Sequence, residues 1–425
     1  MRSRCLPLKR FVDPSRPITY GIVQAGPDVP GGVPYIRPVD MDDHGGVGEH
    51  TVLLRTSADI ARAYARSTTR SGDIIVSIGP SYGKTMVVPA WLDGANLTQG
   101  TARVAPAPQM DRRFLRWALR STTAMDHWDA SVGGATFRAL NLEPLSRTPI
   151  PLVGRAAQTA IADFLDAETA RIDSLVVLRK RQSRLLEERF LVAARELLAG
   201  RTGGQCWNPG PWWLGPVDRS WRPNKIAWCK VTTSGTTPDS GNPAFYDEGG
   251  VPWVTTTELR EQRIIQTQRT VTQLALSEYS ALRVAPPGAV LIAMYGATIG
   301  RLGVLGIWAA MNQACCAVHG DGPLDQGFLY WWLFAFREEI VGEAKGAGQP
   351  NISQETVRSL RVPAPALPEQ QLIAAVIQAR HETLKATQGA LARQILVIQE
   401  RKQALITAAV TGQLDLAREI ADEAS

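Results

Sequence analysis

The sequence has few cysteines and no long apolar segment. Its five cysteines, among 425 residues, form no CxxC pair and no Cys/His spacing of the kind that binds zinc, so we interpret them as reduced thiols in a cytoplasmic protein. The longest apolar run, Phe328 to Phe336, is about half of a membrane span and predicts a buried helix. Met1 to Val12 is basic but has no apolar core, so we expect neither a secretory signal nor a membrane anchor.

A large excess of charge of one sign is also missing. The chain carries 46 Lys and Arg against 40 Asp and Glu, a formal charge of +6, with 44% hydrophobic and 20% charged residues. These values are ordinary for a globular protein of two to four domains. The mild basic excess is compatible with binding to nucleic acid or to another anionic surface, but it does not decide between them.

Intact catalytic and cofactor motifs are absent as well. Gly79 to Thr85 resembles a phosphate-binding loop, but only three residues separate its glycines where four are needed, and a β-prone stretch follows. Asn208 to Trp212 resembles the motif with which adenine methyltransferases hold a flipped base, but a glycine interrupts it. Asp40, Asp42, Asp43 and His44 fall within one loop, which favours a solvated turn over a metal site. We therefore expect no cofactor, no metal and no catalytic residue.

A long helical segment, Leu367 to Leu416, is the most regular feature of the chain. About 45 residues there include no proline after the first turn, and Gly389 is the one glycine before Gly412. Leucine or isoleucine recurs every seven residues, at Leu384, Leu391, Ile398 and Leu405. Such a spacing predicts a narrow apolar seam that pairs with one partner helix.

The partner helix is expected at Leu152 to Gly200, which repeats the later segment in a degraded form. Glu168 and Thr169 align with Glu382 and Thr383, and Gly200 aligns with Gly412. The segments that precede the two helices also repeat each other: SGDIIVSIG at 71–79 matches PGAVLIAMYG at 287–296, and GGVPY at 31–35 matches GGVPW at 249–253. The chain therefore contains two copies of a unit of about 200 residues, each a β-rich domain followed by a long helix.

This repeat predicts an α+β fold with pseudo-two-fold symmetry, in which two long helices pack as an antiparallel coiled coil and separate two β-rich globular domains. We expect the domains at 1–151 and 201–366, the helices at 152–200 and 367–416, and a tail at 417–425. In the first domain the pattern predicts strands at Ile18–Val23, Tyr35–Val39, Thr51–Arg55, Asp73–Ile78 and Thr85–Val88, with helices at Ala58–Ala65 and Arg112–Ala118.

Four segments carry a resemblance to a known family. They are PAPALPEQQLIAAVI at 363–377, RKQALITAAVTGQLD at 401–415, GAGQPNIS at 346–353, and SGTTP followed by GGVPWVTTTEL. Together, in this order, they resemble the specificity subunit of type I restriction-modification systems. The first half departs from the family pattern, because LVGRAAQTAIADF stands where a second copy of LPEQQLIAAVI is expected, and SVGGATFRAL replaces GAGQPNIS.

The resemblance implies a DNA-recognition subunit without catalysis of its own. Two target-recognition domains would each read half of an asymmetric, interrupted sequence in double-stranded DNA. The helices would dock two methyltransferase (M) subunits, and restriction (R) subunits would join in the nuclease complex. The alternative is a coiled-coil scaffold whose β-rich domains bind other proteins, and salt-sensitive binding to duplex DNA would separate the two hypotheses.

Side chains that pair donors with acceptors are the candidates for reading DNA: Arg for guanine, and Asn or Gln for adenine. The repeat singles out Arg37, Lys84, Asn96 and Gln99 in the first domain and Arg301, Asn312 and Gln313 in the second, and the resemblance adds Gln349 and Asn351. Repeated positions also mark a shared architecture, so these amides can instead satisfy backbone groups. Base contacts are more plausible where the two copies diverge, at 41–49 and 260–269, whereas Tyr35 and Trp253 are expected in the core.

Overall fold

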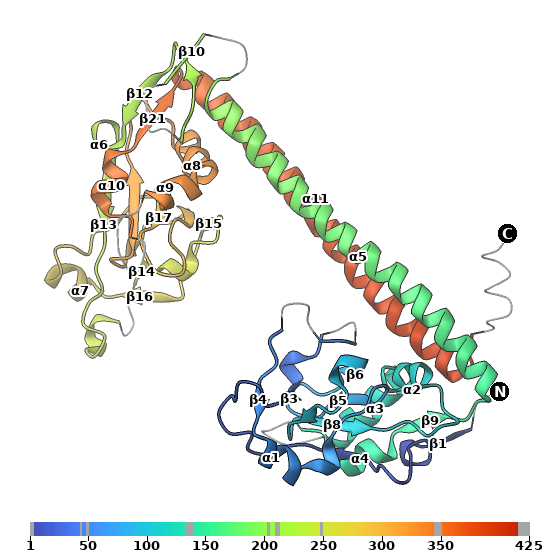
Figure 1. Cartoon of the computed structure of the whole chain (residues 1–425). Coiled ribbons are helices and arrows are strands. Elements are labelled where there is room, and N and C mark those ends of the chain that lie inside the picture. Colours follow the sequence, from blue (N-terminus) through green and yellow to red (C-terminus); the bar gives the residue numbers. More distant parts are fainter. Residues whose placement is uncertain are drawn as a thin grey trace. The chain divides into compact units, whose positions relative to one another are not determined.

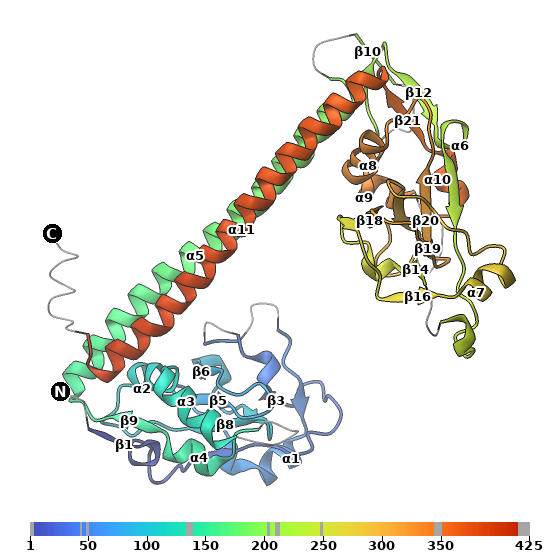
Figure 2. The ribbon, with the colours of Figure 1, turned by 180° about the vertical axis from the view of Figure 1, so that it is seen from behind.

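The structure, a computed structural model, describes residues 4–42, 45–47, 51–132, 139–201, 205–208, 213–246, 250–343 and 351–414. The chain forms two compact units, Met1–Lys180 with Leu391–Ser425, and Arg181–Ala390. Each unit contains one β-rich domain and part of both long helices, α5 (Arg155–Leu198) and α11 (Leu367–Thr411), which lie side by side in Figures 1 and 2. The expected tail at 417–425 falls outside the described residues.

Two small sheets form the first domain. The four-stranded sheet has the order β2-β8-β5-β6, and the three-stranded sheet has the order β4-β3-β7. The strands are β2 (Thr19–Tyr20), β3 (Val33–Ile36), β4 (Arg55–Thr56), β5 (Ile74–Ser77), β6 (Thr85–Val87), β7 (Asn96–Leu97) and β8 (Thr101–Val104). A separate antiparallel pair joins β1 (Cys5–Pro7) to β9 (Pro149–Pro151), immediately before α5.

Most of the strands expected in this domain form, but they are shorter than predicted. The predicted strand Ile18–Val23 forms as β2 and ends at Tyr20, because the chain then crosses to β7, where the Ile22 amide donates to the Leu97 carbonyl at 2.6 Å. The second gives way to a 3-10 helix, η2 (Pro38–Asp40), which begins at Pro38 because proline fixes φ near the helical value. Of the predicted strand Thr51–Arg55, only Arg55 belongs to β4, because β3 pairs with just two residues of this stretch, Arg55 and Thr56.

The two helices that were expected in the first domain begin at residues whose side chains cap them. The expected helices form as α1 (Ala58–Ala63) and α2 (Arg112–Leu119), and the side chains of Ser57 and Asp111 accept from backbone amides of their first turns. Two further helices, which the sequence pattern did not predict, are α3 (Thr122–Ser131) and α4 (Leu142–Arg147). They enclose Trp128, which is fully buried and donates from Nε1 to the Thr148 hydroxyl at 2.7 Å.

The second domain follows the same plan. Its five-stranded sheet has the order β13-β20-β17-β18-β15 and its three-stranded sheet the order β16-β14-β19. The strands are β13 (Val231–Ser234), β14 (Val251–Val254), β15 (Arg263–Ile264), β16 (Arg269–Val271), β17 (Val290–Ala293), β18 (Leu302–Leu305), β19 (Ala310–Met311) and β20 (Cys315–His319). A strand pair, β12 (Arg222–Lys225) with β21 (Arg361–Ala364), leads into α11, and a smaller pair joins β10 (Cys206–Trp207) to β11 (Val217–Asp218).

Helices of the second domain are short apart from the apolar one. They are α6 (Ile226–Cys229), α7 (Gln273–Glu278), α8 (Gln326–Ala335), α9 (Arg337–Gly342) and α10 (Gln354–Ser359). The apolar run 328–336 forms α8 as predicted, and its Phe328 and Trp332 side chains are fully buried. Among the described helices, none is both long and apolar enough to cross a membrane.

The internal repeat is visible in backbone detail. A Cβ atom on Gly21 would lie 2.0 Å from the Leu97 carbonyl oxygen, and one on Gly235 would lie 1.7 Å from that of Met311, so both positions require glycine. The hairpins β5–β6 and β17–β18 turn at Gly83 (φ 99°) and Gly300 (φ 75°). Tyr35 and Trp253 are both buried, which confirms the prediction that they belong to the core.

The long helices pair antiparallel within each unit. In the first unit the Lys402 ammonium lies 2.6 Å from an Asp173 carboxylate oxygen, and in the second the His381 ring packs against Phe190 with centroids 5.3 Å apart. Leu384 and Leu391 are buried in the predicted seam. Both helices end at a glycine in the left-handed region, Gly200 (φ 64°) and Gly412 (φ 73°), where side chains other than hydrogen are disfavoured.

Candidate nucleic-acid interface

Two of the predicted reading residues of the first domain have structural contacts. Asn96 is buried at 1% exposure, accepts from the Ser67 hydroxyl at 2.5 Å and donates to the Ala61 carbonyl at 3.3 Å. The Arg37 guanidinium pairs with Asp40, with Nη2 at 2.8 Å from Oδ1. The Asn96 side chain therefore links β7 to the end of α1, whereas Arg37 makes a local contact at the start of η2.

Lys84 and Gln99 lie closer to the surface of the same domain. The Lys84 ammonium donates to the carbonyl of Met41 at 3.0 Å, so it reaches the start of the segment where the two repeats diverge. The Gln99 side chain is exposed, while its backbone amide donates to the Ile22 carbonyl at 2.8 Å. Their role in DNA binding stays a prediction.

In the second domain the predicted residues differ in exposure. Arg301 is exposed at the β17–β18 turn. The Asn312 side chain accepts from the Ala314 amide at 3.2 Å, and the Gln313 side chain accepts from the Thr237 hydroxyl. Asn351 is exposed and forms an isolated bridge with Tyr295, whereas Gln349 lies outside the described residues.

The divergent segment Arg260–Arg269 presents a dense row of hydrogen-bonding side chains. It contains β15, at the edge of the five-stranded sheet, and ends in β16, at the edge of the three-stranded sheet. Ile264 points inward and is buried at 2% exposure. The exposed side chains of the segment include three arginines and three glutamines, namely Arg260, Arg263, Arg269, Gln262, Gln266 and Gln268. We call this row the reading segment, after the role predicted for it.

The base of the reading segment is fixed by backbone contacts. The Glu258 carboxylate accepts from the amide of Thr255 at 2.6 Å and from that of Gln268 at 2.8 Å. Glu261, which adopts a left-handed backbone (φ 54°), donates from its amide to the Leu302 carbonyl at 2.9 Å and forms an ion pair with Arg337 at 2.7 Å. The segment therefore begins directly beside the exposed Arg301.

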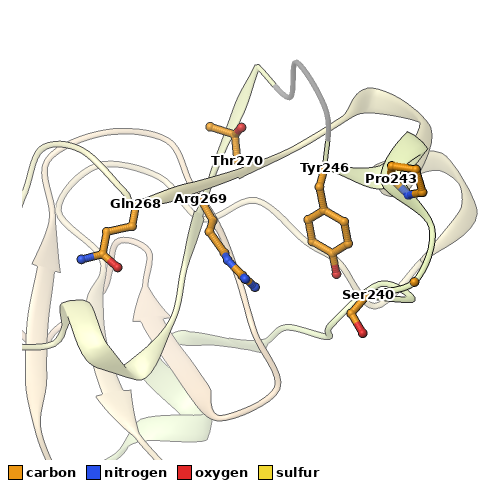
Figure 3. A pocket seen from close by; sticks show the side chains of 7 residues that line it. Ser240, Pro243, Tyr246, Gln268, Arg269 and Thr270 are labelled. Atoms are coloured by element: carbon orange, nitrogen blue, oxygen red, sulfur yellow. The ribbon is translucent and has the colours of Figure 1, made fainter. Parts of the chain in front are cut away.

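Two surface hollows flank the reading segment. The first, of about 550 Å³, is lined by Ser240, Gly241, Pro243, Tyr246, Gln268, Arg269 and Thr270. In Figure 3 the Tyr246 ring and the Arg269 side chain project into the same space, with Ser240 on the far side. Burial raises the pKa of the Tyr246 phenol, which donates to the Pro238 carbonyl at 2.6 Å. The second hollow, of about 580 Å³, is lined by residues 258, 260 and 262–268.

The sequence singled out 260–269 as a candidate for base contacts, which stays a prediction, but it gave no sign of most of the residues around this segment. Tyr246 and Ser240 belong to a separate loop, and no repeat or motif connects that loop with Arg269. Glu258 carries a recognisable signal, because Thr255 and Glu258 have the spacing of a capping box, and that box forms around η6 (Thr256–Glu258).

The divergent segment of the first domain is only partly described, since residues 43–44 and 48–50 lie outside the described residues. Within it, Met41 and Val47 form an antiparallel bridge, and Asp42 accepts from the amides of Gly45 and Gly46 at 2.7 and 2.8 Å. Asp42 thus closes a turn. Across the described ranges, no three acidic, histidine or cysteine side chains are grouped so that they could hold a metal.

Comparison with known proteins connects this interface to one family. A family model for the type I restriction modification DNA specificity domain matches residues 229–395. The EcoBI specificity subunit of a type I restriction enzyme from Escherichia coli is 28% identical over 169 residues, which are 40% of this chain and 35% of that protein. The MjaIX specificity subunit from Methanocaldococcus jannaschii is 25% identical over 169 residues, 39% of this chain and 38% of that one. The matches thus span little more than a third of these relatives.

Similarity to solved structures extends over nearly the whole chain. The crystal structure of an HsdS subunit from Thermoanaerobacter tengcongensis has a TM-score of 0.53 at 20% identity and covers 97% of both chains. A chain from a study of complex assembly and conformational transition of the type I R-M system has a TM-score of 0.73 at 19% identity, covering 97% of this chain and 98% of that one. At these identities the similarity establishes the fold.

Proposed function

We propose that the chain is a DNA sequence-recognition subunit, because residues 229–395 match a family model for the type I restriction modification DNA specificity domain. In this role it reads a bipartite, asymmetric site in double-stranded DNA and directs adenine methylation, or restriction, by partner subunits. It contributes no catalytic group of its own. Each β-rich domain reads one half of the site.

The observation that carries the proposal is the reading segment. Six exposed arginine and glutamine side chains within ten residues present the two groups best suited to base edges: a guanidinium binds the O6 and N7 atoms of guanine, and a carboxamide binds N6 and N7 of adenine. Because Glu258 and Glu261 anchor the backbone below them, these side chains start from a defined position. Preorganised donors and acceptors lose less entropy on binding, so they favour sequence-specific contacts.

Partner docking is supported by apolar side chains that the coiled coil leaves uncovered. In the first unit Leu178 and Val397 are exposed, and in the second Val192 and Leu372 are exposed. A protein surface with several exposed leucines and valines on a helix pair is suited to a further helical partner. We propose that two methyltransferase subunits bind along the helices and that restriction subunits join them in the nuclease complex, in the cytoplasm.

Methylation mapping tests the function directly. Genomic DNA from the source cell should carry one bipartite methylated motif, which disappears when this gene is deleted and returns with a plasmid copy. The purified chain should show no methyltransferase activity, and it should bind a split duplex site when it is assembled with the methyltransferase. If the assembled complex binds DNA without regard to sequence, the chain is instead a scaffold and the proposal is wrong.

A further inference from the structure

The first domain contains a hollow lined by arginines that lies outside the reading segment. Its volume is about 470 Å³, and its lining includes Arg16, Arg66, Arg70 and Arg103. These residues come from the stretch that leads into β2, the connection between α1 and β5, and the middle of β8. Four guanidinium groups around one hollow repel each other unless anions compensate them.

Arg103 is a buried cation with no acidic partner among the described residues. It is 4% exposed, and its guanidinium donates to the carbonyls of Arg66 at 2.6 Å, Thr68 at 2.9 Å and Pro17 at 3.3 Å. Its buried Nε has no acceptor among the described residues, and none of their carboxylates forms an ion pair with it. Burial lowers the pKa of Arg103, but a guanidinium stays charged at neutral pH. Asp73 and Asp13 raise this pKa without forming an ion pair with Arg103, so the positive charge beneath the hollow is only partly compensated.

The surface arginines of the hollow are available to a ligand. Asp73 compensates Arg16, with two contacts of 2.8 and 2.6 Å. Arg66 and Arg70 are exposed and form no ion pair with any described residue, although Arg66 lies 6.0 Å from the centre of the Tyr20 ring. Arg70 also lines a second hollow of about 490 Å³, together with Arg112.

The second domain has a different residue at the buried position. Arg103 of β8 pairs with Thr19 of β2, and the matching position of β20, which pairs with Thr233 of β13, is Ala317. The buried arginine is therefore not part of the architecture that the two domains share. Because the second domain folds with alanine at position 317, the fold itself does not require an arginine at position 103. A ligand-binding role of the first domain accounts for the buried charge there.

We propose that the Arg66–Arg70 hollow of the first domain is a phosphate site that holds the DNA backbone. A guanidinium donates two parallel hydrogen bonds to two phosphate oxygens, which makes phosphodiesters a better match than single-oxygen acceptors. Arg66 and Arg70 contact the phosphates, while Arg103 holds the Arg66–Thr68 backbone in place and adds positive potential. The inference rests on the proposed function, since it takes DNA as the ligand. It adds a backbone contact, which positions the duplex without reading its sequence.

The test uses the full chain with two exposed arginines replaced, Arg66→Ala and Arg70→Ala together. Affinity for a fluorescent duplex is measured at several KCl concentrations. Removal of one arginine–phosphate interaction should reduce the slope of log K against log salt by about 0.9, so we expect a total change of about 2. The decrease in affinity should be equal for the recognised duplex and for a scrambled one. Arg147→Ala is the matched control, because Arg147 is 67% exposed on α4 and does not line the hollow.

An unchanged slope and affinity in the double variant, with an unfolding temperature equal to that of the wild type, would overturn the inference. Isothermal titration with inorganic phosphate distinguishes a site for DNA phosphates from a site for free phosphate. If the double variant no longer binds inorganic phosphate but binds DNA as the wild type does, the hollow is a site for a free anion and the inference is wrong. A failure of this inference can be distinguished from a failure of the proposed function. A chain without sequence preference would still show the change in slope if the hollow binds DNA phosphates, and an unchanged slope leaves sequence reading intact.

Discussion

The carboxylate of Glu258 accepts a hydrogen bond from the backbone amide of Gln268 at 2.8 Å and so connects η6 to the far end of the reading segment. Its other oxygen accepts from the Thr255 amide at 2.6 Å. In the first domain the corresponding Asp40 directs both oxygens to Arg37, at 2.8 to 3.0 Å. An acidic side chain thus caps the 3-10 helix in both domains, Asp40 at η2 and Glu258 at η6. In the second domain this side chain also anchors the reading segment.

Replacing Glu258 with Gln should loosen the reading segment. The amide end of glutamine can satisfy only one of the two backbone donors, and a hydrogen bond to a charged group is worth about 1.5–3 kcal/mol. We expect faster hydrogen exchange at the Gln268 amide and weaker binding to the recognised duplex, with little change for a scrambled duplex. Glu355→Gln, at an exposed position of α10, is the control. Unchanged exchange at Gln268 would contradict this account.

Substitution of one arginine in the reading segment should relax the sequence preference at one base pair. For Arg263→Ala we expect a decrease of about 1–3 kcal/mol in discrimination at that position, and no change in the half-site read by the first domain. Competition between duplexes that differ at single positions measures this. Arg283→Ala, which removes an exposed arginine of the same unit outside the segment, should leave the preference as it is. A uniform decrease across all positions would indicate a phosphate contact instead.

The seam of the coiled coil predicts a contrast between two leucines of α11. Leu384 is 8% exposed, so Leu384→Ala should lower the free energy of unfolding by about 2–4 kcal/mol. Leu396 is 60% exposed, so Leu396→Ala should change it by less than about 0.5 kcal/mol while weakening the binding of the methyltransferase. Urea unfolding and co-purification with the methyltransferase give the two readouts. Equal destabilisation by both variants would rule out the seam described above.

His381 should make stability depend on pH. Its ring packs against Phe190, Trp331 and Phe334, and this burial lowers the pKa of the imidazole. The positive charge of Lys385 lowers the pKa further, while three carboxylates raise it, those of Glu187, Glu382 and Glu261. Because the folded pKa lies below the unfolded value, the stabilisation is complete above about pH 6.5 and is lost as the pH falls through the folded pKa. The free energy of unfolding should differ less between pH 5 and pH 7.5 in His381→Phe than in the wild type.

Local sequence signals were sufficient to predict the repeat and the two long helices. Leu367 begins α11, and Gly200 and Gly412 follow the ends of the two helices, because helix limits depend on local proline, glycine and capping residues. The paired glycines Gly83 and Gly300 turn equivalent hairpins for a similarly local reason. The divergence of 260–269 from its copy marked this segment as a candidate for base contacts, which stays a prediction.

The roles of individual polar side chains, in contrast, depend on tertiary contacts. Asn96 and Arg37 have the chemistry of base readers, but the fold places Asn96 against Ser67 and Arg37 against Asp40. The helices α3 and α4 form around Trp128, so packing specifies them together with the Ser121 cap of α3. Arg66, Arg70 and Arg103 carry no motif and come together through the pairing of β8 with β2 and β5. Burial and partner choice arise from contacts between residues far apart in the sequence, which no local pattern encodes.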